Sequence, residues 1–288
     1  MGISVRVPAT SANLGPGFDC LGLALDIWAT VTVEEADGEP AADGSIAHLV
    51  LQGVWAAFEG VRKAPPLRIA WDGAIPIARG LGASAALRAA GLLAGNALLG
   101  GRHDLEALLE MGTRLETHPD NIAPALFGGL QVVLRTDGGL VHLAVAVPPE
   151  LRVVVFVPDF EMPTQESRRR LPTQLSREDA VFNTSRVGLL VAALAAGRFD
   201  LLAEATRDRI HQPARSAIFP GLVPIMAAAM DAGAAGAYLS GGGSTVAAFV
   251  VEAAERVARS MAEAAVAHGY RGRSIVTAPT ARGAQLLD

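Results

Sequence analysis

A glycine-bearing loop runs directly into a long series of helix-forming residues, and this junction constrains the fold more than any other stretch. Residues 76–91 read P-I-A-R-G-L-G-A-S-A-A-L-R-A-A-G, and an apolar, strand-like run at residues 67–71 precedes them. Gly80 and Gly82 permit a positive φ and a close approach of the backbone. Ser84 stands where a helix N-cap is expected. We therefore expect a strand, a turn and a helix in that order.

The start of such a helix is suited to binding phosphate. Its first N–H groups have no acceptor within the helix, and the helix dipole favours negative charge there. A glycine loop that enters a helix N-terminus is therefore a recurring phosphate site. An ordinary loop before a core helix has the same pattern, and for a lone G-x-G that interpretation would be favoured. Two further glycine-rich stretches, at residues 15–17 and 241–243, favour the phosphate site instead.

Composition excludes several classes of function. The 288 residues are 51% hydrophobic and 18% charged, which is typical of a globular chain of one large or two medium domains. The net charge is −5 and no basic block occurs, so nucleic acid is not an expected partner. We expect no signal peptide and no membrane span, and hence a soluble, cytoplasmic protein. The single cysteine, Cys20, excludes an internal disulfide and a thiolate metal cluster.

Hydrophobic periodicity predicts two halves with different arrangements. In the first half we expect strands near residues 3–8 and 21–35, helices near 48–58, 84–99 and 104–116, and a hairpin over 131–147. The charged, glycine-bearing segment 34–44 is expected to be a surface loop. Pro148 and Pro149 mark a domain junction, so the predicted domains are 1–148 and 149–288. The second half predicts the order β-α-α-α-β-β-α-β, with helices near 180–196, 200–211, 222–232 and 253–268, which favours a ferredoxin-like antiparallel sheet.

Two strings of polar residues among prolines and glycines are candidates for binding a small molecule. Residues 8–25 read P-A-T-S-A-N-L-G-P-G-F-D-C-L-G-L-A-L, where small residues around Asn13 and Asp19 leave room for a ligand. Residues 116–129 read E-T-H-P-D-N-I-A-P-A-L-F-G-G and place His, Asp and Asn beside a proline. Structural turns with Asx bonds would explain both strings equally, and for the first string alone the turn is the favoured interpretation.

Taken together, these motifs resemble those of the GHMP kinases, and of the homoserine kinase branch in particular. G-L-G-A-S-A-A is similar to the family's G-L-G-S-S-A-A, with Ala83 in place of the first serine, and S-G-G-G-S-T at 240–245 is similar to S-G-x-G-P-T. The two polar strings resemble branch motifs, and the likeness covers almost the whole chain. It implies an α+β fold of two domains. The N-terminal domain would resemble domain 2 of ribosomal protein S5, and the C-terminal domain would be ferredoxin-like.

The resemblance implies the reaction of ATP with L-homoserine to give ADP and O-phospho-L-homoserine, a step towards threonine. The phosphates of ATP would lie at the glycine loop, and Ser84 would contribute its hydroxyl to Mg²⁺ or phosphate. The residues expected to bind the nucleotide are Pro76, Ile77, Ala78, Arg79, Gly80, Leu81, Gly82, Ala83, Ser84, Ala85 and Ala86.

The resemblance also assigns the groups that hold the amino acid. Asp19 would hold its ammonium group, and Arg168 and Arg215 would bind its carboxylate, which suits the fork geometry of a guanidinium. Asn13 would lie near the acceptor hydroxyl, and His118 and Asn121 would line the pocket. The residues expected to take part in catalysis are Asn13, Ser84 and Asn121. No general base stands out, because Asn13 is neutral and cannot accept a proton at pH 7.

One departure from the family pattern concerns the metal. Members usually carry a glutamate four residues before the histidine at position 118, and this chain has Arg114 there. Glu110 lies one helical turn earlier, where it could pair with Arg114, and Glu116 lies two residues later. Mg²⁺ needs only one or two protein oxygens when phosphates supply the others. The chain could have lost the direct contact between a carboxylate and Mg²⁺, or a neighbouring carboxylate could have replaced the missing glutamate, and both alternatives stay open. Ser84 and Glu110 are the residues assigned to the metal.

Three functions therefore remain to be distinguished. The first is an active homoserine kinase, the second a GHMP kinase of another small alcohol, and the third a catalytically impaired protein that binds ATP or an amino acid. The chain has expected binding residues for both an ammonium group and a carboxylate, and this disfavours an acceptor alcohol that has no amine. Ala83, Arg114 and Ser244 motivate the impaired homologue. A homodimer is also expected.

Overall fold

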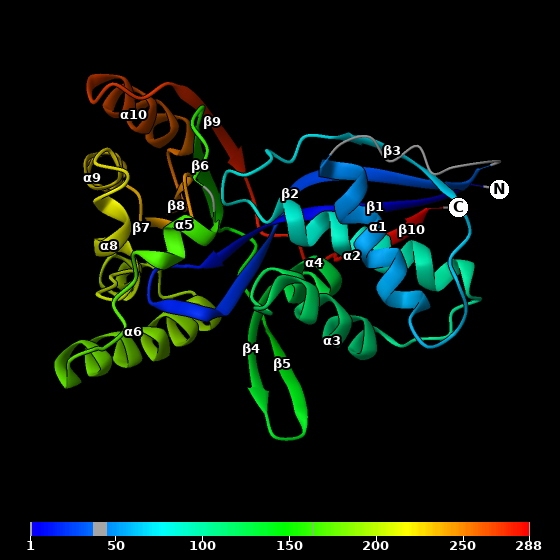
Figure 1. Ribbon diagram of the computed structural model, residues 1–288. Coiled ribbons are helices and arrows are strands. Elements are labelled where there is room, and N and C mark those ends of the chain that lie inside the picture. Colours follow the sequence, from blue (N-terminus) through cyan, green and yellow to red (C-terminus); the bar gives the residue numbers. More distant parts are fainter. Residues whose placement is uncertain (1, 37–44, 163, 288) are drawn as a thin grey trace.

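The computed structural model describes residues 2–36, 45–162 and 164–287, which form two antiparallel sheets with helices packed on them (Figure 1). The first sheet has six strands in the order β10-β1-β2-β4-β5, with β3 paired to β2. The second has four strands in the order β7-β8-β6-β9. Most of the expected loop at 34–44 lies outside the described residues.

The bounds of the elements follow the chain. The strands are β1 Gly2–Asn13, β2 Gly17–Glu35, β3 Leu67–Gly73, β4 Leu130–Thr136, β5 Gly139–Val145, β6 Arg152–Pro158, β7 Gly236–Leu239, β8 Val246–Val250, β9 Gly272–Thr277 and β10 Gln285–Leu287. The helices are α1 Ser45–Phe58, α2 Ala83–Leu98, α3 Leu105–Glu116, α4 Ile122–Phe127, α5 Thr164–Arg169, α6 Arg177–Ala196, α7 Leu202–Ala205, α8 Gln212–Ser216, α9 Leu222–Asp231 and α10 Ala254–Ala267, and a 3₁₀ turn, η1, covers Phe199–Leu201.

The long hairpin of β1 and β2 connects the two halves. Strand β2 alternates between buried and more exposed positions over residues 25–33, whereas β1 is buried from Val7 to Asn13. The register of the pair shifts between Pro8 and Ala9 and again between Ala12 and Asn13. Asn13 and Leu14 have φ of 70° and 50° at its tip, which turns the chain back. The tip extends from the first sheet into the second half (Figure 1). There the N–H of Gly241 donates to the carbonyl of Ala12 at 3.0 Å.

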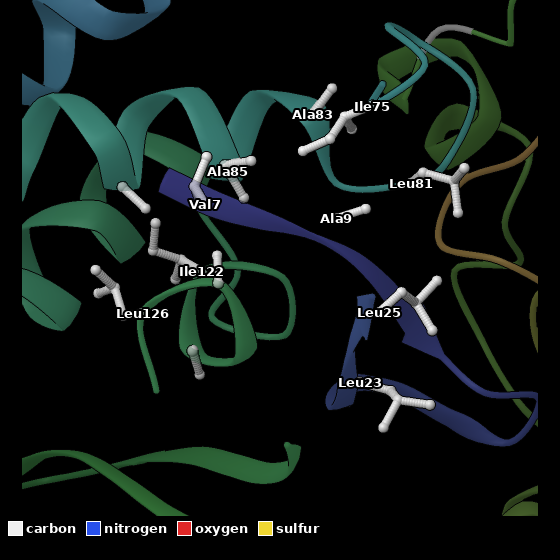
Figure 2. Packing of buried hydrophobic residues seen from close by; sticks show 14 of the residues in the cluster. Val7, Ala9, Leu23, Leu25, Ile75, Leu81, Ala83, Ala85, Ile122 and Leu126 are labelled. Atoms are coloured by element: carbon white, nitrogen blue, oxygen red, sulfur yellow. The ribbon is translucent and has the colours of Figure 1, made fainter. Parts of the chain in front are cut away.

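Helix α2 is buried along most of its length, as its apolar residues on nearly every face predict. Figure 2 shows Ala85 of α2 on the side of the helix that faces Val7 of β1. Helix α1 packs on the helix's other side, where a Cβ added at Gly91 would lie 2.0 Å from the carbonyl oxygen of Val50. Since β1 and α1 hold the helix from two sides, they fix the direction in which its N-terminus points.

The second sheet confirms the ferredoxin-like prediction. Numbered along the chain from β6, its strands lie in the order second, third, first, fourth, and all neighbours are antiparallel. Helices α9 and α10 pack against one another and against the sheet, and they bury side chains such as Leu222, Val257 and Met261.

Two predictions about the second half differ from the structure. The helix expected over 200–211 is wrong: α7 ends at Ala205, and the chain then turns because the carboxylate of Asp208 accepts N–H bonds from Ile210, His211 and Gln212. The last residues also return to the first sheet, where β10 pairs with β1. The division at residue 148 stays a prediction, but residues 285–287 belong with the first sheet rather than with the C-terminal half.

The α1–α2 contact gives a stability prediction. Gly91→Ala should lower the free energy of unfolding by about 1–3 kcal/mol, because its Cβ would overlap the carbonyl of Val50 and force the helices apart. Gly188 in α6 is the matched control, since a Cβ there meets nothing within 4 Å. Gly188→Ala should raise the free energy by about 0.5–1 kcal/mol through helix propensity. Urea unfolding compares the two, and shifts of the same sign would contradict the close contact.

Candidate active site

A cleft of about 630 Å³ is lined by residues from both halves of the chain. The first half contributes the hairpin tip, the glycine loop and the segment between α3 and α4, and the second half contributes α5, α8 and the loop between β7 and β8. A second depression of about 680 Å³ lies beside the C-terminal end of α1. None of the predicted site residues lines this second depression, so the cleft is the place to test the sequence analysis.

The glycine loop has the backbone that its sequence predicts. Gly80 and Gly82 have φ of 78° and 64°. A Cβ at Gly80 would lie 2.4 Å from the carbonyl of Ser240, and one at Gly82 would lie 1.8 Å from Oγ1 of Thr10. The β7–β8 loop holds the glycine loop, since the Ser240 hydroxyl donates to the Gly80 carbonyl at 2.6 Å. The glycine-rich loop at residues 240–245 therefore lies directly beside the glycine loop at residues 80–82.

The N-cap prediction for Ser84 is wrong. Gly82 occupies the N-cap in the left-handed conformation, and α2 begins at Ala83. Within the described residues no side chain caps this helix, and its first two residues, Ala83 and Ser84, line the cleft. Ser84 is the second residue of the helix, and its hydroxyl donates to the carboxylate of Glu116 at 3.1 Å.

The residues of the loop contribute to the cleft in different ways. Those that line it are Ile77, Ala78, Arg79, Gly80, Gly82, Ala83 and Ser84. The others do not line it: Leu81, Ala85 and Ala86 are buried in the core, and Pro76 precedes the cleft wall. The guanidinium of Arg79 donates to the carbonyls of Pro158 and Asp159 at 2.9 and 2.6 Å, so it joins the two halves rather than pointing a free charge into the cleft. The groups of this loop that are open to a ligand are therefore mainly backbone groups rather than charged side chains.

At the other end of the cleft, Asp19 and Arg168 form a bidentate ion pair with distances of 2.9 and 2.7 Å. The hydrogen bond to Asp19 raises the pKa of Arg168. The ring of Phe18 lies 4.9 Å from the guanidinium of Arg168 and 5.6 Å from that of Arg215. The structure therefore brings together three charged residues from distant parts of the sequence, and both arginines lie near one aromatic ring.

Arg215 is fully buried, and a histidine fixes its direction. Its Nη1 donates to Nδ1 of His211 at 2.8 Å and to the carbonyl of Gly241 at 3.0 Å. Nε2 of His211 donates to the carbonyl of Gly15 at 2.7 Å, which assigns the proton to that nitrogen. Burial lowers the pKa of His211 to about 4, so the ring is neutral and accepts from Arg215. Burial also lowers the pKa of Arg215, to about 10, which leaves it a cation at neutral pH.

Asn13 and Asn121 line the cleft, but their amides also hold neighbouring backbone and side chains. Asn13 donates to the carbonyl of Gly241 at 3.0 Å and accepts from the N–H of Asp19 at 3.1 Å. Asn121 accepts from the hydroxyl of Thr10 at 2.8 Å. Each amide keeps only part of its hydrogen-bonding capacity for a ligand.

Two ionisable groups beside Asn121 have shifted pKa values. His118 lines the cleft, and burial, followed by the charge of Arg168, lowers the pKa of its ring. Asp120 is buried, and its carboxylate accepts from the side chain of Asn121 at 3.3 Å. Burial, with the nearby charge of Asp19, raises the pKa of Asp120 to about 7. Asp120 is therefore a buried group whose ionisation the fold disfavours.

The structure does not bring Glu110 to the cleft. Its carboxylate accepts from the backbone N–H of Leu140 and pairs with Arg135 at 3.4 Å, beside the β4–β5 hairpin. Arg114 does not pair with it either, since it lies 3.8 Å from Glu59. Glu116, the other neighbouring carboxylate, does line the cleft, and it bonds to Ser84 and Arg88. It is the last residue of α3, where the chain turns toward the cleft.

Known proteins are similar to this chain over nearly its whole length. The model of the GHMP kinases N-terminal domain matches residues 48–129, and that of the GHMP kinases C-terminal domain matches residues 190–267. A homoserine kinase of Desulfitobacterium hafniense is 38% identical over 99% of this chain and 100% of its own length. The chain belongs to the homoserine kinase branch of the GHMP kinase family.

Other relatives agree with this placement. A homoserine kinase of Deinococcus radiodurans is 44% identical over 85% of this chain and 83% of its own. The crystal structure of a homoserine kinase from Cytophaga hutchinsonii has a TM-score of 0.89 at 31% identity and covers 99% of this chain and 97% of that one. The mevalonate kinase of L. major, at 16% identity and a TM-score of 0.66, shares the fold of this GHMP kinase.

Sequence analysis missed several residues that shape the site of this GHMP kinase. Phe18 is part of the G-F-D string, and His211 follows Asp208 in a polar turn, so both were visible but had no assigned role. Arg88 did stand out in the sequence, as the one charged residue of an otherwise apolar helix and a neighbour of the glycine loop, but it had no assigned role. Asp120 gave no signal beyond its motif, since its burial depends on how α4 packs against β2.

The raised pKa of Asp120 predicts a pH dependence of stability. The folded state keeps the proton up to about pH 7, whereas an unfolded aspartate releases it near its ordinary value of 3.8. The folded state therefore binds more protons in this window, and stability falls as pH rises through it. Asp120→Asn removes this loss. As pH rises from 4 to 8, the free energy of unfolding of the variant should increase by roughly 1–3 kcal/mol relative to that of the wild type.

Urea unfolding of the protein without ligands, at several pH values, measures this gain. Asp137→Asn, which changes an exposed carboxylate in the turn between β4 and β5, is the matched control and should show no trend. A constant difference between Asp120→Asn and wild type across the range would show that Asp120 is ionised in the folded protein.

Proposed function

We propose that this chain transfers the γ-phosphoryl group of ATP to the hydroxyl of L-homoserine, in the route to threonine. The observation that carries the proposal is a pair of sites in one cleft. The glycine loop and the start of α2 suit a polyphosphate, and Asp19, Arg168 and Arg215 at the other end suit a small zwitterion.

The residues of the cleft support this reaction through position and charge. Phosphoryl transfer depends mainly on in-line positioning and on neutralising the phosphates. The N–H groups at the start of α2 are proposed to bind the phosphates, and Asp19 to bind the ammonium group. Arg168 and Arg215 are proposed to share the carboxylate. Both have a buried Nε that finds no acceptor among the described residues, as expected of donors that serve a ligand.

Three more residues are proposed to place the acceptor hydroxyl. Asn13 and Asn121 keep hydrogen-bonding capacity toward the cleft, and His118 lines the wall beside them. Neither amide accepts a proton at pH 7. We therefore propose that the proton of the hydroxyl passes to phosphate or solvent.

We also propose that the nucleotide is bound with Mg²⁺, which would neutralise phosphate charge. The donor set fits: the hydroxyl of Ser84 and the carboxylate of Glu116 lie together at the phosphate end. In the described part of the chain no group of three or more His, Cys, Asp or Glu could hold a metal alone. A site with few protein oxygens suits Mg²⁺, which takes its remaining ligands from phosphates and water. Glu116 thus replaces Glu110 in the proposed metal site.

The two alternative functions fit the cleft less well. An acceptor alcohol that has a carboxylate but no amine would draw Arg168 away from Asp19 and leave that carboxylate unpaired. The catalytically impaired homologue was motivated by three substitutions. Arg114 lies away from the cleft, and the hydroxyl of Ser244 donates to the carbonyl of Phe160. Of the three, only Ala83 lines the cleft, and the next residue, Ser84, still supplies a hydroxyl there.

Release of ADP from ATP and Mg²⁺ tests the proposal. We expect release that depends on L-homoserine and is saturable, with little release when a hydroxy acid of similar length replaces the amino acid. Asp19→Asn should raise the KM for homoserine by about tenfold or more, since a charge-assisted bond to the ammonium is lost, and should change the KM for ATP far less. Binding of homoserine without ADP release above background would exclude catalysis. Equal changes in both KM values would remove Asp19 from its assigned role.

We further propose that the protein acts as a homodimer through strand β5. This strand is one of the edges of the first sheet, and its sequence G-L-V-H-L-A-V has no Asp, Glu, Lys or Arg. Leu134, Val141 and Leu143 on the β4–β5 hairpin are 48%, 52% and 67% exposed. Antiparallel pairing of β5 with a second copy about a two-fold axis would satisfy the backbone groups of this edge and place apolar side chains of the two copies beside one another, without opposing like charges.

Leu143→Glu tests this interface, because it would place two carboxylates opposite each other across the two-fold axis. Light scattering should show the mass of two chains for the wild type and of one chain for the variant. Val181→Glu changes an equally exposed residue on α6 and should leave the dimer intact. A monomeric wild type, or a dimeric Leu143→Glu, would rule out this surface.

The proposed location is the cytoplasm, without a membrane or nucleic acid as partner. The net charge of −5 without a basic block supports the second part. Among the described helices, α6 alone is long and apolar enough to cross a membrane by length and composition, which is weak support for a span. Its first turn carries Arg177, Glu178 and Asp179, and Arg209 pairs with both acidic residues.

A further inference from the structure

We infer that the guanidinium of Arg88 attracts the nucleotide phosphates at their end of the cleft. We also infer that it neutralises the carboxylate of Glu116 while no metal ion is bound there. The inference rests on the proposed function, since it concerns how this site receives a nucleotide. It adds a cationic side chain that binds phosphate, which neither the glycine loop nor the residues proposed to bind the amino acid supply.

The first observation is the contact between Arg88 and Glu116. Arg88 lies in the second turn of α2, and its Nη1 donates to Oε1 of Glu116. The hydroxyl of Ser84 donates to the other oxygen of the same carboxylate at 3.1 Å. The side chains of Arg88 and Glu116 are 16% and 13% exposed, and all three residues line the cleft. The pair is therefore largely shielded from water and close to the expected phosphates.

The second observation is that Arg88 is fixed from its other side. Its Nε and Nη2 both donate to Oε1 of Gln52 on α1, at 3.0 and 2.8 Å. The amide of Gln52 in turn lies 3.1 Å from the ring of His48. The guanidinium is thus held in one plane between α1 and α3. A residue held in this way acts from a fixed position, which differs from a flexible surface arginine.

The third observation is the distribution of the other cations that line the cleft. The glycine loop is not followed by a lysine, and the guanidinium of Arg79 is bound by backbone carbonyls. Arg168 and Arg215 lie at the amino-acid end, around Phe18. Of the described residues that line the cleft, Arg88 is therefore the cation left for the phosphate end.

These positions give Arg88 and Glu116 opposite effects on a nucleotide without metal. An ionised Glu116 repels a polyphosphate, and Arg88 both cancels that charge and attracts the phosphates. A metal ion that uses Glu116 competes with Arg88 for the same carboxylate. Removing Arg88 should therefore weaken binding of metal-free nucleotide, and removing the charge of Glu116 should strengthen it.

Isothermal titration of ADP in EDTA measures this binding without any catalytic turnover. Arg88→Gln keeps a partner for Gln52 but loses the charge, and we expect its affinity for ADP to fall by about tenfold or more. Arg88→Lys keeps the charge and should stay within about fivefold of wild type. Glu116→Gln should bind metal-free ADP more tightly than wild type, by roughly threefold to tenfold. Higher salt should shrink these differences.

Arg114→Gln is the matched control. It removes an arginine only two residues from Glu116, but this arginine is exposed, pairs with Glu59 and does not line the cleft. Its affinity for ADP should equal that of the wild type. A similar loss in Arg114→Gln and Arg88→Gln would assign the effect to net charge rather than to the position of Arg88.

The outcomes separate this inference from the proposed function. Unchanged ADP affinity in Arg88→Gln, with an unchanged melting temperature, would overturn it. If Arg88→Gln fails to fold, the sign of the change in Glu116→Gln decides, since weaker metal-free binding there would also overturn it. A wild type that binds nucleotide only with Mg²⁺ would sink the inference and leave the kinase proposal standing. A wild type that binds no nucleotide with or without Mg²⁺ would sink both.

Discussion

The carbonyl of Gly241 holds the two halves of the site together. It accepts from the amide of Asn13 at the hairpin tip and from the buried guanidinium of Arg215 on α8, while the N–H of the same residue donates to Ala12. The same loop holds the glycine loop through Ser240. One irregular segment thus sets both the phosphate end and the amino-acid end of the cleft. Glycine is required there because Gly241 and Gly243 have φ of 53° and 92°.

The cleft has a charged pair at each end, and each pair mimics part of what it is proposed to bind. Asp19 and Arg168 satisfy one another as a bound ammonium and carboxylate would, and Arg88 and Glu116 do the same at the phosphate end. Such pairs avoid leaving an uncompensated charge in a half-buried site. They also favour ligands that carry charges of both signs, because a ligand of one sign would leave one partner unpaired. Specificity for the ligand then depends on the cost of separating these ion pairs as well as on the new bonds that the ligand forms.

Motifs that depend on local backbone geometry were predictable from the sequence, whereas contacts set by packing were not. Gly80 and Gly82 adopt positive φ as expected, and Asp104 caps α3 through the N–H of Ala107. The periodicity of the second half was sufficient for the ferredoxin-like strand order. Glu110 was misplaced because helical spacing relates residues to each other but does not show which face meets the cleft. The return of β10 to β1 could not be predicted either, since three residues carry too little pattern.

The end of α3 shows why the site needs an additional cation. Glu116 is the last residue of this helix, and Thr117 follows in the left-handed conformation with φ 69°. A carboxylate at a helix C-terminus opposes the helix dipole, which costs about 0.3–1 kcal/mol. A residue chosen for helix stability alone would be basic there, as Arg114 is two residues earlier in the same turn. The acidic residue at this position is therefore explained by the cleft rather than by the helix, and Arg88 offsets the charge that the helix itself disfavours.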